Sequence, residues 1–454
     1  MSQTPEHRAP QGAAPDDGGP APAPVDAPAD LTGGAGSSAS DGTVAAPGGA
    51  TETEARSGSL ARDLLGGSAM VSVLAVVAAL VIGGIIIAAI DEDTRNAGAY
   101  FFARPLDTFQ AGWTAVVEAY SAMFRGAIYD YRAEAFVRQV KPITDTLFYA
   151  VPLTLAGLGL AIGFRAGLFN IGGQGQVILG AMVAGYIGFT FQLPIIVHLL
   201  VCVAGAMIAG ALWAGIAGGL KARTGANEVI VTIMLNSIAG LLLAYVLTRD
   251  AFQIPGSNEP RSPEVYDAAR YPLIFDNPLR LHYGLLLALL AVVAVWWLLE
   301  RSTAGFELRA TGANPSAALN AGISTNRVTV TTMALSGALC GAAGSVQVLG
   351  DTHYLSAGVA GSIGFDAITV ALLGRSRPVG TLVAGILFGA FKAGSFAMAR
   401  VGVPVDIVLV VQSVIVLLIA APPLVRWLFR LPTPGAPKRR PARARRAQTS
   451  EVAA

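Results

Sequence analysis

The chain has 454 residues, of which 53% are hydrophobic and only 13% are charged, and its formal net charge at pH 7 is +2. Because soluble domains carry about 25% charged residues, this composition excludes an ordinary soluble globular protein. Several apolar runs approach the length of about 20 residues that crosses a bilayer, which predicts an all-α integral membrane protein. The sequence does not have the alternating pattern of a membrane β-barrel.

The two ends of the chain differ from the rest. Residues 1–60 are rich in Pro, Ala, Gly, Ser and Asp and hold little that could be buried, so we predict a disordered tail. The first apolar run begins only at Ala69 and is too long for a signal peptide. Residues 431–454 are Pro-rich and basic, and we interpret them as a second disordered tail that anchors the topology rather than binding nucleic acid. Residues 61–430 form the predicted transmembrane domain.

Ten apolar stretches predict about ten transmembrane helices in this domain. They cover residues 69–90, 146–164, 177–191, 195–219, 229–248, 282–299, 328–349, 363–374, 379–399 and 406–425. The eighth stretch is short, which is typical of a re-entrant or broken helix.

Lys and Arg residues gather in the short loops on one side of the predicted bundle, a pattern typical of the cytoplasmic face. These residues are Lys221, Arg223, Arg301, Arg309, Arg327, Arg375 and Arg377. Both termini are therefore predicted to be cytoplasmic, and the longer segments 91–141 and 249–281 to face outward. The first of these segments contains the helix-like stretch FQAGWTAVVEAYSAMFRGAIYD.

A discontinuous Gly-rich segment, GLFNIGGQGQ at residues 167–176, separates two apolar runs. Backbone at membrane depth leaves the helix only where it is buried in protein or lines a cavity, and such interruptions are typical of transport sites. We therefore expect Phe169, Asn170, Gln174 and Gln176 to line a solute pathway. In the alternative interpretation the glycines allow close helix packing and the amides cap helix ends.

A second Gly-rich turn enters an apolar run at GSIGFDAITVALLGR, residues 361–375. Its likeness to the first segment suggests an internal repeat, which is common in transporters. We expect Phe365 and Asp366 to face residues 167–176 across the pathway. Asp366 near a helix start could instead be a cap.

The predicted cytoplasmic loop 303–324 contains a short helix between two spans. Glu307 and Arg309 precede a Gly-x-Asn-Pro turn that includes Gly312, Asn314 and Pro315. Pro at the start and Gly at the end of a short helix is the expected asymmetry, and here Gly322 closes a helix that contains Ala318. A solvent-side helix of this kind has little reason to exist for packing, so we interpret it as a docking surface. The alternative is an ordinary connector.

Four motifs stand in order along the chain: FRAGLFNIGGQGQ, NEVIVTIMLNSIAG, ATGANPSAALNAGI and GFDAITVALLGRSRPVG. Over residues 145–425 they resemble the permease subunits of ABC importers for nucleosides and simple sugars, a family related to ribose and branched-chain amino acid permeases. The second motif adds Asn236 to the expected pathway residues. The chain departs from the family at Gln174, where an acidic residue is common.

This resemblance implies a permease that takes up nucleosides, or ribose-like sugars, by alternating access in a prokaryotic cell membrane. A separate cytoplasmic ABC ATPase would dock on residues 303–324, and an extracytoplasmic substrate-binding lipoprotein on residues 249–281. Such permeases pair with a second permease chain, often a different one and sometimes a copy. The sequence independently places ATP hydrolysis elsewhere, because none of its four lysines follows a glycine as the phosphate-binding loop requires.

The sequence gives no support for an enzyme. The four histidines are scattered, Cys202 and Cys340 lie in apolar runs, and we predict no catalytic residue, metal site or cofactor. The alternative function is a proton-coupled secondary transporter of a small polar solute, since intramembrane ionisable residues often mark proton relays. Against it, Glu228 suits a helix start, and Lys392 is near enough to the outer boundary for its side chain to reach water.

Overall fold

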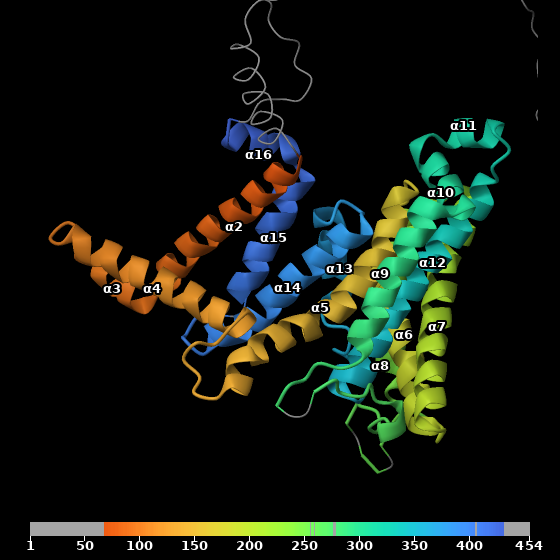
Figure 1. Cartoon of the computed structure of the whole chain (residues 1–454), viewed down its shortest axis with the longest axis horizontal. Helices are drawn as coiled ribbons and strands as arrows, with labels where there is room; N and C mark the ends of the chain where they lie inside the picture. The colour runs from red at the N-terminus through yellow and green to blue at the C-terminus, as the bar shows by residue number, and fades with distance from the viewer. Residues whose placement is uncertain (1–67, 255, 258, 276–277, 405, 431–454) are drawn as a thin grey trace, which may run out of the picture. The chain divides into compact units, whose positions relative to one another are not determined.

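The structure is a computed structural model that describes residues 68–430 except 255, 258, 276–277 and 405 (Figure 1). The two predicted tails, 1–60 and 431–454, lie outside the described residues. The described part belongs to one compact unit. Apart from two isolated β-bridges, its regular structure is helical, so the prediction of an all-α protein is confirmed.

The helices follow one another along the chain as Figure 1 labels them. They are α2 Ser68–Ile90, α3 Glu92–Gly98, α4 Pro105–Ala127, α5 Phe136–Arg165, α6 Gly173–Thr190, α7 Ile195–Thr224, α8 Glu228–Val246, α9 Gly284–Arg301, α10 Thr303–Ala313, α11 Pro315–Asn320, α12 Thr325–Val346, α13 Ile363–Leu373, α14 Pro378–Ala399, α15 Asp406–Ala420 and α16 Pro422–Leu428. A short 3-10 helix covers Asp267–Ala269, and a π-helix, Gln347–Thr352, extends α12.

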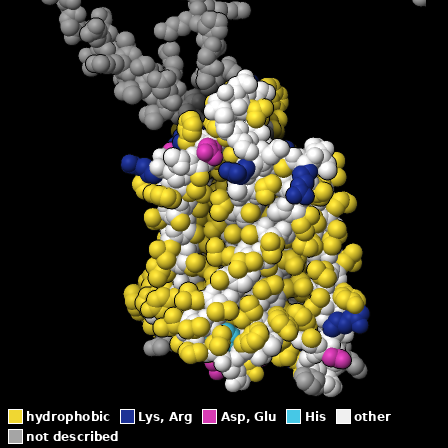
Figure 2. All heavy atoms as spheres, turned by 90° about the vertical axis from the view of Figure 1, so that its right-hand side faces the viewer, with side chains coloured by type: hydrophobic (Ala, Val, Ile, Leu, Met, Phe, Trp, Pro, Cys, Tyr) yellow, Lys and Arg dark blue, Asp and Glu magenta, His cyan; other side chains and the backbone are white. Residues whose placement is uncertain are grey.

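Nine of the ten predicted stretches each overlap one helix, and the tenth, 406–425, covers α15 and the first part of α16. Among the described residues, seven helices are long and apolar enough to cross a membrane, and α13 and α15 are shorter apolar helices. Figure 2 shows a broad band of hydrophobic side chains with Lys and Arg side chains towards its edges, as a bilayer-spanning surface requires. The chain is therefore a multi-pass membrane protein.

The turn between α7 and α8 illustrates how the sequence ends one helix and begins the next. Gly225 follows α7 with a left-handed φ of 71°, which glycine adopts without steric cost. Asn227 then caps α8, because its side-chain oxygen accepts a hydrogen bond of 2.9 Å from the Val229 amide. These local signals place the start of α8 at Glu228.

The core of the bundle forms around α5 and α12. Helix α12 packs on α5, α6 and α7, and α5 packs on α13 and α14. The crossing of α7 and α12 is so close that a Cβ atom on Gly337 would clash with the Gly210 carbonyl. Small residues allow such close packing in membranes, where lipid gives apolar side chains no reason to associate.

A second group of helices comprises α2, α4, α15 and α16. Helix α2 packs on α4, α15 and α16, and α4 reaches the main core through α14. In Figure 1, α10, α11 and α16 lie at one end of the bundle, which we call the α11 side. The described residues between 249 and 283 lie at the other end, which we call the loop side.

Candidate functional site

The Gly-rich segment is a break between α5, which ends at Arg165, and α6, which begins at Gly173. Gly167 has a left-handed φ of 70° and packs against the backbone of Gly312 in α10. A side chain at Gly312 would collide with the backbone of Arg165 and Ala166. The break is therefore in direct backbone contact with the element that precedes α11.

Asn170 and Gln176 are buried and bind each other. The Asn170 amide nitrogen donates to Gln176 Oε1 (3.1 Å) and the Gln176 amide nitrogen donates to Asn170 Oδ1 (3.0 Å). Asn170 also donates to Ser336 Oγ in α12 and accepts from the Gly172 amide, both at 2.9 Å. Their exposures of 0% and 1% leave neither side chain facing a pathway. This placement differs from our expectation, because the polar groups of the break need partners inside the protein.

Asn236 holds the same break from α8. Its amide nitrogen donates to the Ile171 carbonyl (2.9 Å), and its Oδ1 accepts from the Gly175 amide (2.8 Å). Asn236 thus satisfies one backbone group before α6 and one in its first turn, groups that the helix itself leaves without partners.

Gln174 connects the two Gly-rich turns. Its amide nitrogen donates to the Gly361 carbonyl (2.7 Å), and its Oε1 accepts from the Gly364 amide (2.9 Å). A Cβ atom on Gly173 would lie 3.2 Å from the Gly364 carbonyl oxygen, so the backbones also touch. The two turns that we expected to face each other are in direct contact.

Three of the predicted pathway residues project out of the packed interior. Phe169 and Phe365 are 45% and 50% exposed, and Asp366 is half-buried in the first turn of α13. Phe169 lies 4.8 Å from Phe164, ring centroid to centroid, which fixes its position. Asp366 accepts a hydrogen bond of 2.6 Å from Ser362. The rest of the chain does not enclose these three side chains.

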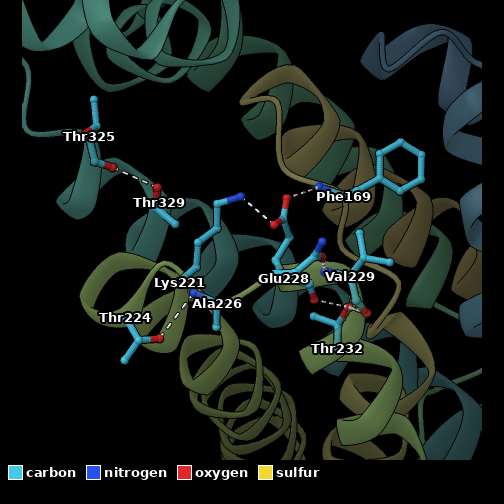
Figure 3. Close-up of polar contacts among 10 residues, drawn as sticks. Phe169, Lys221, Thr224, Ala226, Glu228, Val229, Thr232, Thr325 and Thr329 are labelled. Atoms are coloured by element: carbon cyan, nitrogen blue, oxygen red, sulfur yellow. Dashed lines mark hydrogen bonds and ion pairs between the residues drawn. The ribbon is translucent and has the colours of Figure 1, made fainter.

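Glu228 has a role that the sequence did not reveal. Figure 3 shows its carboxylate between the Lys221 ammonium group and the backbone amide of Phe169. Lys221 Nζ lies 2.5 Å from Oε2, and the Phe169 amide nitrogen lies 3.4 Å from Oε1. Glu228 therefore links the break to α7 and α8, in addition to beginning α8 as expected.

The predicted docking element forms α10 and α11. Asn314 caps α11 by accepting a 3.1 Å hydrogen bond from the Ala317 amide, Pro315 is the first helical residue, and Gly322 follows with a φ of 83°. Glu307 is exposed, whereas Arg309 is half-buried. Ala318 is only 4% exposed and faces its own chain, so it does not contribute to an exposed docking surface as we expected.

Two large hydrophobic side chains of this element are exposed, and the sequence did not single them out. Phe306 on α10 and Leu319 on α11 are both 61% exposed. Among the described residues, no group of three His, Cys, Asp or Glu side chains could hold a metal ion.

Comparison with known proteins identifies the family. Residues 143–420 match the family described as "Branched-chain amino acid transport system / permease component". The guanosine ABC transporter permease protein NupP of Bacillus subtilis is 36% identical over 320 residues, which cover 69% of this chain and 88% of that protein. The glucose ABC transporter permease protein TsgB13 of Haloferax volcanii is 34% identical over 355 residues, which cover 76% of this chain and 85% of that protein.

The nucleoside ABC transporter permease protein NupB of Lactococcus lactis is also similar, with 34% identity over 290 residues, 62% of this chain and 79% of that protein. No solved structure matches the chain. The family match runs from within α5 to the end of α15 and covers more than half of the sequence. The chain therefore belongs to the branched-chain amino acid transport system permease family, as a membrane subunit of an ABC transporter.

Proposed function

We propose that this permease takes up nucleosides by alternating access, with the α11 side in the cytoplasm and the loop side outside the cell. The observation that carries the proposal is the contact between the two Gly-rich turns through Gln174. Interrupted helices that meet within a membrane protein are typical of solute sites. Two of the similar permeases described above are named for guanosine or nucleosides.

The exposed aromatic side chains support a nucleoside as the solute. Phe169 and Phe365 offer ring faces, and aromatic rings stack favourably on one another. The half-buried carboxylate of Asp366 can accept hydrogen bonds from ribose hydroxyl groups. A sugar is the second candidate, because the similar TsgB13 is named as a glucose permease.

The four amide side chains have a different role in this proposal. Asn170, Gln176 and Asn236 fix the backbone of the break, and Gln174 holds the second turn against it. They support the pathway without facing the solute. The four residues remain part of the proposed site as its framework.

In this proposal, α10 and α11 couple ATP hydrolysis by the ATPase to transport by the permease. An ABC ATPase on the α11 side would contact the exposed Leu319 and Phe306. Because Gly312 in α10 touches Gly167 in the break, a displacement of the docking element would move the break directly. This backbone contact offers a short mechanical connection between ATP hydrolysis and the solute site.

The remaining partners follow from the same proposal. A second, different permease chain is supported by NupQ, which comes from the same organism as NupP and is 27% identical to this chain. We propose that an extracytoplasmic binding lipoprotein docks on residues 249–281 at the loop side, and that membrane lipids surround the apolar band. The proton-coupled alternative is not favoured, because the similar permeases are ABC transporter subunits.

Uptake by the complete complex tests the substrate. With its ATPase, partner permease and binding protein in proteoliposomes, we expect ATP-dependent uptake of labelled guanosine that unlabelled nucleosides inhibit and glucose does not. Preferential uptake of glucose would show that the substrate is a sugar rather than a nucleoside. Uptake that needs a proton gradient and no ATP would contradict the proposal as a whole.

Two alanine variants distinguish a residue that supports the backbone of the break from a residue that lines the solute pathway. Asn170→Ala removes the partners of buried groups, each worth about 1–3 kcal/mol, so we expect several-fold less folded protein in the membrane. The transport rate per molecule should change little. Phe169→Ala removes a half-exposed side chain, so we expect near-normal abundance and uptake reduced about tenfold, which corresponds to about 1.4 kcal/mol.

Immunoblots of the membrane fraction and guanosine uptake, measured on the same preparations, check both variants. Normal abundance together with lost uptake in Asn170→Ala would show instead that this amide binds the solute. Unchanged uptake in Phe169→Ala would remove Phe169 from the pathway.

A further inference from the structure

Lys392 is an ionisable residue inside a membrane-spanning helix. It lies on α14 seven positions before the last residue, Ala399, which is about 10 Å along a helix that rises about 1.5 Å per residue. The sequence suggested that its side chain reaches water at the outer boundary. In the structure Lys392 is half-buried, and its ammonium group lies over the ring of Tyr149 in α5, 5.5 Å from the ring centroid.

Three other side chains accompany Lys392. The Tyr149 ring lies 5.9 Å from the ring of Phe396, which is one turn further along α14. Asp366 lies in the first turn of α13, a helix that packs on both α5 and α14. Tyr149, Lys392, Phe396 and Asp366, which we call the α14 cluster, thus combine two aromatic faces with one positive and one negative charge.

This α14 cluster adjoins a cavity that opens at the loop side. The cavity has a volume of about 820 Å³, a size typical of ligand pockets, and both Tyr149 and Phe396 line it. Pro278, from the segment at the loop side, also lines it. Its remaining walls include small residues of α4 and α14 and charged side chains of both signs, so water and a polar solute can enter.

The other end of the α14 cluster reaches the Gly-rich turns. Asp366 belongs to the first turn of α13 and accepts a hydrogen bond from Ser362. Gln174 binds Gly361 and Gly364 on either side of Ser362. Through Tyr149 the α14 cluster borders the cavity, and through Asp366 it borders the Gly-rich turn that Gln174 holds against the break.

We propose that Tyr149, Lys392 and Asp366 form a specificity-determining station on the solute route from this cavity to the break. The inference rests on the proposed function and extends it. Lys392 supplies hydrogen-bond donors, Asp366 supplies acceptors, and Tyr149 supplies a ring face. With one positive and one negative side chain, the station carries no net charge, so it selects a neutral solute with an aromatic ring and hydroxyl groups over an anion.

A bland explanation is that Lys392 and Asp366 only neutralise each other, since an isolated charge within a membrane is costly. A double variant separates the two explanations. We expect Lys392→Met and Asp366→Asn each to lower membrane abundance, and the combination to restore it. The KM for guanosine uptake by the double variant should stay at least tenfold above that of the wild type. A double variant with wild-type abundance and wild-type KM would overturn the proposal.

Cysteine accessibility tests the same station without transport. The native Cys202 and Cys340 are buried, so a water-soluble thiol reagent added from outside should give little background. We expect Lys392→Cys to be labelled by it, and guanosine to slow the labelling several-fold. Ser395→Cys is the matched control, because Ser395 lies on the same helix at 3% exposure and should stay unlabelled.

Guanosine uptake by the wild-type complex, measured in parallel, shows whether a negative result refutes the proposed function or only the proposed station. A wild-type complex that takes up no guanosine would refute the proposed function. Normal wild-type uptake with no labelling at position 392, or with labelling that guanosine does not slow, would refute the station alone.

Discussion

Gly337→Val is expected to remove nearly all folded permease from the membrane. At the crossing of α7 and α12, a Cβ atom on Gly337 would clash with the Gly210 carbonyl and with Ala214 Cβ. Backbone atoms cannot rotate away as side chains can, so the two helices would have to separate. Overpacking of a core typically costs about 1–3 kcal/mol, and we expect at least the upper end here, about a 100-fold change in the folding equilibrium.

Membrane abundance and the melting temperature of the detergent-solubilised protein check this expectation. Gly215→Val is the matched control, because Gly215 lies on α7 beside the same crossing and a Cβ atom there would meet nothing within 4 Å. We expect its abundance to stay close to that of the wild type. If both variants lost membrane abundance equally, valine would destabilise these helices through its helix propensity rather than through a packing clash.

Most helices could be predicted from the sequence because most apolar runs approach the length that a bilayer imposes, although α13 and α15 are shorter. The start of α5 was wrong by about three turns: the prediction began at residue 146, whereas the helix begins at Phe136. Charged residues and Pro142 interrupt the apolar pattern there. The Lys141 ammonium group and the Asp145 carboxylate, one turn apart, form an ion pair of 2.5 Å that supports the additional turns.

The candidate site was harder to predict than the fold. An amide between two apolar runs can satisfy either a solute or the backbone, and the sequence alone does not distinguish these uses. The choice depends on partners far along the chain, such as Ser336 for Asn170. In the same way, the sequence located α11 but not which of its faces is exposed, because six residues are too few to establish a periodic pattern.

Leu319→Asp is expected to uncouple the permease from its ATPase while leaving it folded. Leu319 is 61% exposed on α11, so a carboxylate there remains hydrated and the free permease should keep normal abundance. If α11 inserts into the ATPase, the same carboxylate becomes a buried and unpaired charge. Losing a central apolar contact of this kind costs at least about 2 kcal/mol, or about 30-fold in affinity.

Co-purification of the ATPase with tagged permease, together with ATP-dependent guanosine uptake, measures this effect, and both should fall at least tenfold. Leu319→Met keeps an apolar side chain of similar size and should retain both. Ala318→Asp is the informative contrast, because Ala318 is buried against its own chain and the new charge should reduce the amount of folded permease instead. If Leu319→Asp retained the ATPase and full uptake, α11 would be only a connector, and the contact between Gly312 and Gly167 would then pack two elements without transmitting force between them.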